Sequence, residues 1–343
     1  MQSSKVVTPL AIVGVVIVLI AAAVSLSIWG GGSSGSSSSS STSAGTPTTT
    51  SVPGGNPTTN AGQITSLTLD SHKDYGNKYA SGLLPVGDAK YVTDDPKLGS
   101  VYLCNAPISG GGGAGSRGPW FTNNNTQYDS TQKITVAGNV SWNGNYSMSL
   151  TGGSRVVTTN DLPTGQTTGT FPIASSDPAY QYDRNPNTIK AQSLTYTLNA
   201  NPQIRTQPAC VSGEVGVMTT GIALFDAFDA GGRDAGAWEI QDHCGGHPMM
   251  QGEYHYHTLS PCIQDTGITT VIGYALDGFP ITGPKVSATN ILTTSDLDEC
   301  HGITSTITLD GKPVTTYHYV MTQDFPYSVS CFRSTAAQAP RPG

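Results

Sequence analysis

Short runs of β-branched and alternating residues, separated by glycine turns, recur along most of this 343-residue chain. Examples are SLTYTLNA at 193–200 and TTVIGYAL at 269–276. The segment TITLDGKPVTTYHYV, residues 306–320, predicts a β-hairpin, because Asp310-Gly311 accepts the positive φ of a tight turn. Runs this short, bounded by turns, constrain the chain to a fold built mainly from short strands.

The composition favours the same fold class. Only 11% of the residues are charged, whereas surface helices draw on Glu and Lys for their helix propensity. One segment, GIALFDAFDAGGRDAGAWEI at 221–240, is a candidate helix despite its glycine pair. From residue 63 onward we find no clear internal repeat. We therefore predict a mainly β, disulfide-stabilised, loop-rich single domain over residues 63–343, with its core at about 100–333.

Residues 1–29 predict a transmembrane signal anchor. The 24 positions from Val6 to Trp29 carry no charge, and about 20 apolar residues cross the ~30 Å hydrocarbon core of a bilayer. Lys5 lies on the short side of this segment, so the positive-inside rule places the N-terminus in the cytoplasm and the remainder outside. A cleaved signal peptide is the alternative. We expect a single-pass protein of the cell membrane with an extracytoplasmic C-terminal domain.

Features beyond this segment agree with export. Residues 30–62 are rich in Ser, Gly, Thr and Pro and predict a disordered linker, because they offer almost no apolar surface to bury. Three Asn-x-Ser/Thr sequons predict glycosylation at Asn124, Asn139 and Asn145.

The cysteines predict a disulfide framework, since an even number in an exported domain is typical of paired thiols. The six are Cys104, Cys210, Cys244, Cys262, Cys300 and Cys331. Fifteen pairings exist for six cysteines. We predict Cys244–Cys262 and Cys300–Cys331 as nearest neighbours in sequence, which leaves Cys104–Cys210.

Histidines are concentrated in one segment. Six of the seven lie between residues 243 and 318, and DHCGGHPMMQGEYHYHTLSPC at 242–262 holds four. Tyr254 to His257 alternate, so in a strand His255 and His257 share one face with Cα atoms about 6.6 Å apart. The two tyrosines then pack into the core on the other face, with their hydroxyls hydrogen-bonded.

Such spacing suits a metal or substrate site. His318 in Tyr317-His318-Tyr319 is a candidate third ligand from a neighbouring strand, and His243 and His247 flank Cys244 in an H-C-x-x-H spacing. Three imidazoles that leave one coordination position open would hold a copper or zinc ion. Candidate carboxylates for orienting these rings are Glu239, Asp242, Glu253 and Asp277. The alternative is a structural network in which each ring is satisfied by main-chain oxygens.

Other chemistries receive less support. The acidic segment DAFDAGGRDAGAWE lacks the spacing of an EF-hand loop, so calcium is the less favoured ion. Turn-capping and orientation of the histidines are the preferred roles of its carboxylates. From residue 63 onward, neither a nucleophile elbow nor a phosphate-binding loop occurs, and no catalytic residues are assigned. The net charge of −7, without any Lys/Arg cluster, gives no basic face for nucleic acid.

Several separated motifs occur in order along the chain: YDRNPNTI, DAFDAGGRDA, WEIQDHCGGHPMMQGEYHYHTLSPC, IGYALDGFPITGP, LDECHG and YHYVMTQDFPYSVSCF. Together, over roughly residues 100–333, they resemble the YHYH-domain family. The resemblance implies an exported domain and supplies no catalytic residues. The family's second motif often has two histidines, whereas Val320 replaces the last one here.

Three functions follow as hypotheses. The first is an extracytoplasmic module that binds a transition metal through the histidines. The second is a metal-free hydrolase in which a carboxylate orients a histidine as general base. The third is a surface recognition or structural module without catalysis.

Overall fold

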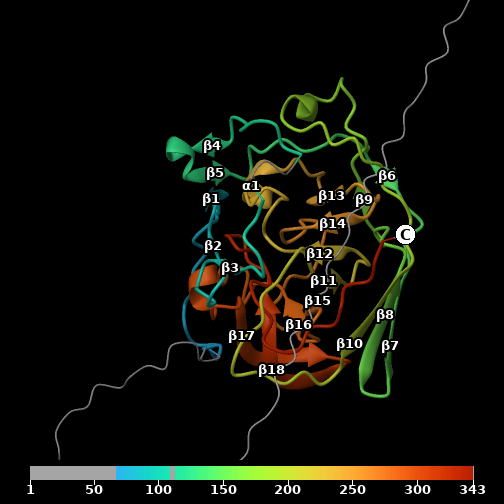
Figure 1. Ribbon diagram of the computed structural model, residues 1–343. Coiled ribbons are helices and arrows are strands. Elements are labelled where there is room, and N and C mark those ends of the chain that lie inside the picture. Colours follow the sequence, from blue (N-terminus) through green and yellow to red (C-terminus); the bar gives the residue numbers. More distant parts are fainter. Residues whose placement is uncertain (1–66, 109–112, 343) are drawn as a thin grey trace, which may run out of the picture. The chain divides into compact units, whose positions relative to one another are not determined.

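Eight strands form the central sheet of the protein in a computed structural model that describes residues 67–108 and 113–342 (Figure 1). Their order is β13-β14-β12-β11-β15-β16-β18-β17. The strands are β11 (Glu214–Met218), β12 (Ala223–Phe225), β13 (Gly246–Pro248), β14 (Tyr254–Tyr256), β15 (Val271–Ala275), β16 (Pro280–Thr282), β17 (Gly302–Leu309) and β18 (Lys312–Val320). The predicted anchor and linker lie outside the described residues.

The central sheet consists of two halves with the same strand arrangement, each running from one edge to the middle of the sheet. Strands β11 and β12 pair antiparallel, β12 and β14 pair parallel, and β13 closes the edge against β14. Strands β15, β16, β18 and β17 repeat these pairings, and the two halves meet where β11 pairs antiparallel with β15. The two halves of the sheet therefore share one topology, although the sequence shows no clear internal repeat.

Smaller sheets flank the central one. The order β10-β8-β7 joins β7 (Tyr146–Thr151), β8 (Ser154–Thr159) and β10 (Leu194–Asn199), and β1 (Leu83–Pro85) pairs with β5 (Gln127–Asp129), which pairs with β4 (Phe121–Thr122). Two-stranded pairs join β2 (Tyr91–Val92) to β3 (Val101–Tyr102) and β6 (Val140–Ser141) to β9 (Thr167–Thr168). The helices are η1 (Asn123–Asn125), η2 (Pro178–Gln181), η3 (Thr294–Asp296) and α1 (Ala235–Trp238).

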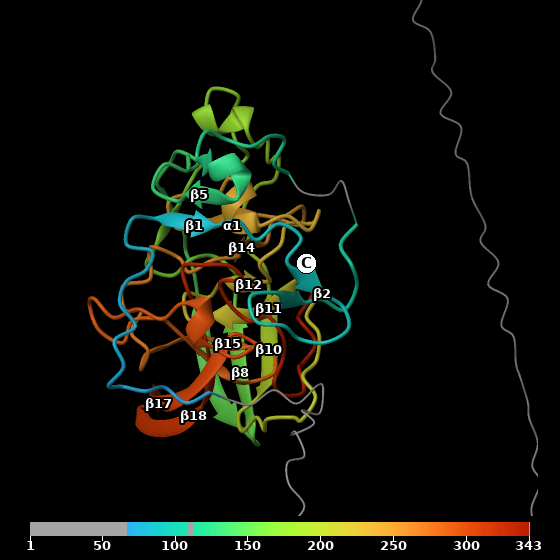
Figure 2. The ribbon, with the colours of Figure 1, turned by 90° about the vertical axis from the view of Figure 1, so that its left-hand side faces the viewer.

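Packing between these sheets builds the core and supports the site. Alternate residues of β10, Leu194, Tyr196 and Leu198, face the central sheet, as the period of two in a strand requires. Strands β1 and β5 lie beside α1 (Figure 2), where the Trp120 indole donates to the Ala237 carbonyl at 2.9 Å. This contact fixes the helix immediately before Glu239.

Tyrosines of the two Tyr-His-Tyr segments are buried, and their hydroxyls are hydrogen-bonded. The Tyr254 hydroxyl donates to Asp242 at 2.9 Å, and the Tyr256 hydroxyl to Gln166 at 2.9 Å. The predicted core role of both residues is confirmed. Buried hydroxyls of this kind keep their partners because an unpaired polar group in the core costs about 1–3 kcal/mol.

The structure confirms the three predicted disulfides, Cys104–Cys210, Cys244–Cys262 and Cys300–Cys331. It also confirms the predicted hairpin, in which Asp310 and Gly311 take φ of +52° and +77° between β17 and β18. The mainly β, loop-rich class holds for the described residues.

The prediction of a helix over residues 221–240 is largely wrong. Its first part forms β12 and only Ala235–Trp238 is helical, because aspartate side chains cap turns between them. No helix in the described part of the chain is long and apolar enough to cross a membrane. The three sequon asparagines are exposed, and glycosylation stays a prediction.

Candidate metal centre

Three histidines meet at the β13–β14 edge of the central sheet. His247 lies opposite His255 in the antiparallel register, and His257 directly follows β14 on the same face as His255. The ring centroid of His247 lies 4.5 Å from that of His255 and 5.6 Å from that of His257, and the centroids of His255 and His257 are 5.0 Å apart. One ring nitrogen of each lies within 4.8 Å of the others. These residues are called the three-histidine cluster below.

Glu239 joins the cluster through one oxygen. Its Oε2 lies 3.2 Å from His247 Nε2 and 3.3 Å from His257 Nε2. Burial alone would raise the pKa of Glu239, but the neighbouring His247 and His257 hold it well below its usual range. Burial opposes a charge on His247, and Glu239 nevertheless raises the pKa of that ring. Burial lowers the pKa of His255 and His257, so both rings are neutral.

Main-chain oxygens orient two of the rings. His257 Nδ1 lies 2.5 Å from the Asp226 carbonyl, which only accepts, so Nδ1 carries the proton and the lone pair is on Nε2. His255 Nδ1 lies 3.4 Å from the Glu253 carbonyl, and the Phe225 ring stacks on His255 with centroids 4.3 Å apart. Ligating histidines characteristically donate their second N–H in this way.

Other atoms of the cluster have no hydrogen-bond partner. Within the described residues, Glu239 Oε2 and both ring nitrogens of His247 are buried and lack a hydrogen bond of normal geometry, although Oε2 lies only 3.2 Å from His247 Nε2. A buried polar group left in this state costs free energy unless something else satisfies it. The ring nitrogens and Glu239 Oε2 therefore converge on one point, where they could act as ligands of a metal ion.

A pocket of about 590 Å³ leads to these atoms. It is lined by the three-histidine cluster and Glu239, and it extends to Met249 and to Met250, which is 77% exposed. Its acidic lining groups, among the described residues, are Asp183, Asp226, Asp229 and Glu239, and no lysine or arginine lines it. The buried rings are thus reached by a pocket that favours a cation or a neutral molecule over an anion.

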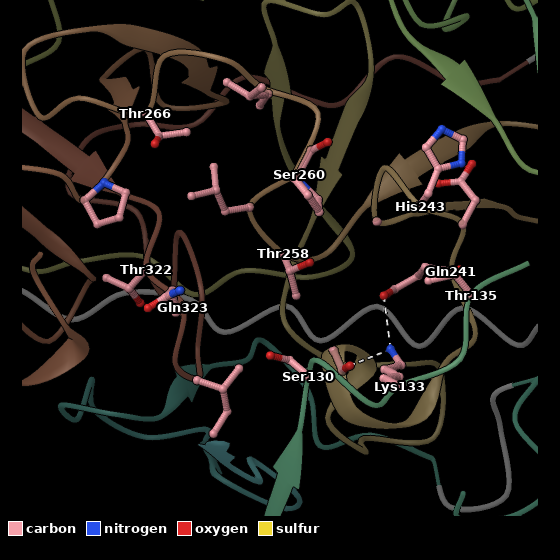
Figure 3. Close-up of a pocket in the computed structure, with 18 of the residues that line it drawn as sticks. Ser130, Lys133, Thr135, Gln241, His243, Thr258, Ser260, Thr266, Thr322 and Gln323 are labelled. Carbon is pink, nitrogen blue, oxygen red and sulfur yellow. Dashed lines mark hydrogen bonds between the residues drawn. The ribbon is translucent and has the colours of Figure 1, made fainter. Parts of the chain in front are cut away.

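His243 lies away from the cluster, which corrects its predicted place among the ligands. Its ring is exposed, contacts Thr167 Oγ1 at 3.2 Å, and lines a different pocket of about 410 Å³ (Figure 3). His243 also lies near Cys244 and Cys262, but the disulfide between those sulfurs leaves no thiolate to bind a metal.

This second pocket contains a lysine that the sequence did not single out. The Lys133 ammonium donates to the Gly236 carbonyl at 2.6 Å and to Gln241 Oε1 at 3.2 Å (Figure 3). Burial lowers the pKa of Lys133 to about 8. An isolated lysine in a turn-rich segment carries no sequence signal, because its enclosure depends on residues more than 100 positions away.

His318 is also outside the cluster, so its predicted role as a third ligand does not hold. Both of its ring nitrogens are engaged, Nδ1 with Thr282 Oγ1 at 2.9 Å and Nε2 with Ser305 Oγ at 2.7 Å. The strand that carries it, β18, belongs to the other half of the sheet. The third ring of the cluster is that of His247.

Of the predicted carboxylates, only Glu239 contacts the rings through its side chain. Asp242 accepts from Tyr254, and Asp277 accepts from the Tyr319 hydroxyl at 2.7 Å and from a main-chain amide. Glu253 reaches the cluster through its carbonyl, while burial raises the pKa of its carboxyl to about 7. Asp242 and Asp277 therefore hold tyrosines in the core and do not orient histidines.

The sequence also gave no sign that Asp226 would act through its carbonyl. Its carboxylate caps a turn by accepting from the Gly213 and Phe228 amides, and the Asp229 and Asp234 carboxylates also accept main-chain amides. The turn-capping interpretation of this acidic segment is confirmed. A carbonyl at a hydrogen-bonding position has no signature in the side-chain pattern.

Fold and site together define a mainly β, disulfide-linked domain with a buried three-histidine cluster at one edge of its central sheet. Residues 195–292 match the family model described as YHYH protein, in agreement with the resemblance of the sequence motifs to that family. The match covers the three-histidine cluster and ends before β17. Comparisons with curated proteins and with solved structures gave no significant match.

Proposed function

We propose that this protein is a membrane-anchored, extracytoplasmic module that binds one transition-metal ion through the three-histidine cluster. The observation that carries the proposal is the position of Glu239 Oε2, 3.2 Å and 3.3 Å from two ring nitrogens and hydrogen-bonded to neither. Three imidazoles and one carboxylate are a ligand set found in zinc and copper proteins.

The tautomer of His257 sharpens this argument. Because its Nδ1–H donates to the Asp226 carbonyl, its Nε2 lone pair faces the lone pairs of Glu239 Oε2 across 3.3 Å. Two acceptors at this distance repel each other unless a positive charge lies close to both. A proton on His247 supplies part of that charge in the metal-free protein, and a divalent cation would satisfy all the ligand atoms together.

The spacing of the rings is compatible with one ion. Ligand atoms about 2.0–2.1 Å from a zinc ion lie about 3.4 Å from one another. The nitrogens of the three-histidine cluster lie within 4.8 Å, so small ring rotations bring them to this separation. The pocket beside them leaves a position for water or a substrate, as in metal sites that carry out hydrolysis.

The location of the module rests on the rest of the chain. The uncharged segment from Val6 to Trp29 supports the membrane anchor, and three disulfides support an oxidising, extracytoplasmic environment.

Metal content of the purified full-length chain tests the proposal. After removal of metal with a chelator and reloading with zinc or copper, we expect about one ion per chain by elemental analysis. His255→Ala and His257→Ala should abolish binding, whereas His243→Ala, the matched change outside the cluster, should leave it intact. Wild-type protein that retains no metal after reloading would overturn the proposal.

A metal-free hydrolase is the second candidate, because His247 and Glu239 form a buried acid–base pair beside the same pocket. A screen of ester, phosphoester and glycoside substrates addresses it. Activity that persists in the presence of a chelator and is lost in Glu239→Gln would favour this candidate over metal binding.

A further inference from the structure

The two halves of the central sheet repeat each other in atomic detail at the turns that precede β13 and β17. In the turns 242–246 and 298–302, the leading aspartate accepts from the cysteine amide two residues on, at 2.9 Å and 3.0 Å. It also accepts from the glycine amide four residues on, at 3.3 Å and 2.9 Å. In each turn, the aspartate amide donates back to that glycine carbonyl, at 2.9 Å and 3.0 Å.

The packing against each turn is also shared. The first tyrosine of each Tyr-His-Tyr segment, Tyr254 or Tyr317, donates its hydroxyl to the aspartate of its own turn, at 2.9 Å and 3.0 Å. A Cβ on Gly246 or Gly302 would collide with the same tyrosine ring, so both positions require glycine. In each half, a disulfide then ties the cysteine of the turn to the loop that follows β14 or β18.

The inner hairpins of the two halves agree as well. The β11–β12 turn and the β15–β16 turn each contain a glycine at positive φ, Gly221 at +86° and Gly278 at +90°. Four elements in the same order, with the same pairings and the same turn contacts, make each half a copy of one structural unit. This equivalence allows residues of one half to be placed on those of the other by register.

The register identifies what stands at the ligand positions in the second half. Gly246 pairs with Tyr256 and His247 with His255, whereas Gly302 pairs with Tyr319 and Ile303 with His318. The counterparts of the three-histidine cluster are therefore Ile303, His318 and Val320.

Besides Ile303 and Val320 in place of His247 and His257, two further residues differ between the halves. Leu224 of β12 pairs with Tyr256 and Ile281 of β16 with Tyr319, so Thr282 occupies the position of Phe225. By the same register along β13 and β17, Ser305 follows Ile303 at the spacing at which Met249 follows His247. Thr282 and Ser305 are the residues whose hydroxyls engage the two nitrogens of His318.

We propose that the second half of the sheet carries a vestigial copy of the metal site, closed by Ile303 and Val320, in which His318 is the retained ligand. Both closing residues are at most 1% exposed and pack in one apolar cluster with Leu292 and Leu297. The hydroxyls of Thr282 and Ser305 replace the metal as partners of the remaining imidazole. The inference rests on the proposed function, since it takes the three-histidine cluster as the intact site.

Restoring the ligands tests this assignment. The test uses the full-length triple variant Ile303→His/Val320→His/Ser305→Ala, made in the background His247→Asn/His257→Asn. Produced with added zinc, this protein should bind about one zinc ion per chain. The background protein alone should bind none. In an otherwise wild-type chain, the same triple change should raise zinc from about one to about two ions per chain.

A folded triple variant that binds no additional zinc, while wild type binds one ion, overturns this inference and leaves the proposed function standing. If the wild-type protein binds no zinc, the proposed function is overturned. Zinc binding by the triple variant then tests by itself whether the two halves of the sheet are equivalent. The reverse variant His247→Ile/His257→Val covers the case in which the triple variant does not fold. Its folding without zinc would support the equivalence, and failure of both variants to fold would overturn it.

Discussion

Replacing Glu239 by glutamine removes the carboxylate that lies between the rings of His247 and His257 and changes little else in volume. Leaving one partner of a buried ion pair alone costs about 3–5 kcal/mol. A glutamine amide donates to neutral imidazoles, and a net hydrogen bond offsets about 0.5–1.5 kcal/mol of that loss. We therefore expect the metal-free variant to lose about 1.5–4.5 kcal/mol of unfolding free energy. At about 2–4 °C per kcal/mol for a domain of this size, Tm falls by about 3–18 °C.

The loss should depend on pH in a defined direction. Glu239 has a pKa below its unfolded value of about 4.3, so its contribution is present above that pH and is lost as pH falls through the folded pKa. His247 has a pKa above its unfolded value of about 6.5, so its contribution is present below that pH and is lost as pH rises through the folded pKa. The deficit should be larger near pH 5.5 than near pH 8.5, because about pH 4.3–6.5 is the window in which both contribute.

Thermal melting followed by circular dichroism, in chelator at both pH values, measures this effect. Glu299→Gln is the matched control, because it makes the same change at a half-buried glutamate outside the cluster. Zinc affinity by competition titration should fall about 10–100-fold or more in Glu239→Gln. Equal Tm values for wild type and Glu239→Gln at both pH values would refute the assigned electrostatics of the site.

Three further predictions concern the framework and location. Cys244→Ala/Cys262→Ala opens an 18-residue loop and should lower the unfolding free energy by about 3 kcal/mol in denaturant titrations, with weaker zinc binding because the disulfide closes just beyond His257. Tyr319→Phe leaves Asp277 without its hydroxyl donor and should cost about 1–3 kcal/mol in the same titrations, with zinc stoichiometry unchanged. Deletion of residues 1–29 should move the protein from the membrane fraction to the soluble fraction after alkaline extraction, and an unchanged distribution would contradict the anchor.

The sequence by itself determined features that depend on neighbours along the chain. Alternation of tyrosine and histidine over 254–257 placed His255 and His257 on one face, because the side-chain period of a strand is two. Asp310-Gly311 predicted the β17–β18 hairpin through its local conformational preference. Cysteine spacing predicted Cys244–Cys262 and Cys300–Cys331 for a similar reason, since neighbours in sequence tend to be close in space, and Cys104–Cys210 followed as the remaining pair.

Only the tertiary structure decided which histidines converge. His243 and His247 flank the same cysteine, yet the β13–β14 register places His247 opposite His255 and leaves His243 exposed. His255 and His318 share the same Tyr-His-Tyr context, but the adjacent strand supplies Phe225 to one and Thr282 to the other. Such contacts are set by pairing between distant strands and by main-chain carbonyls, and neither leaves a pattern in the residues nearby.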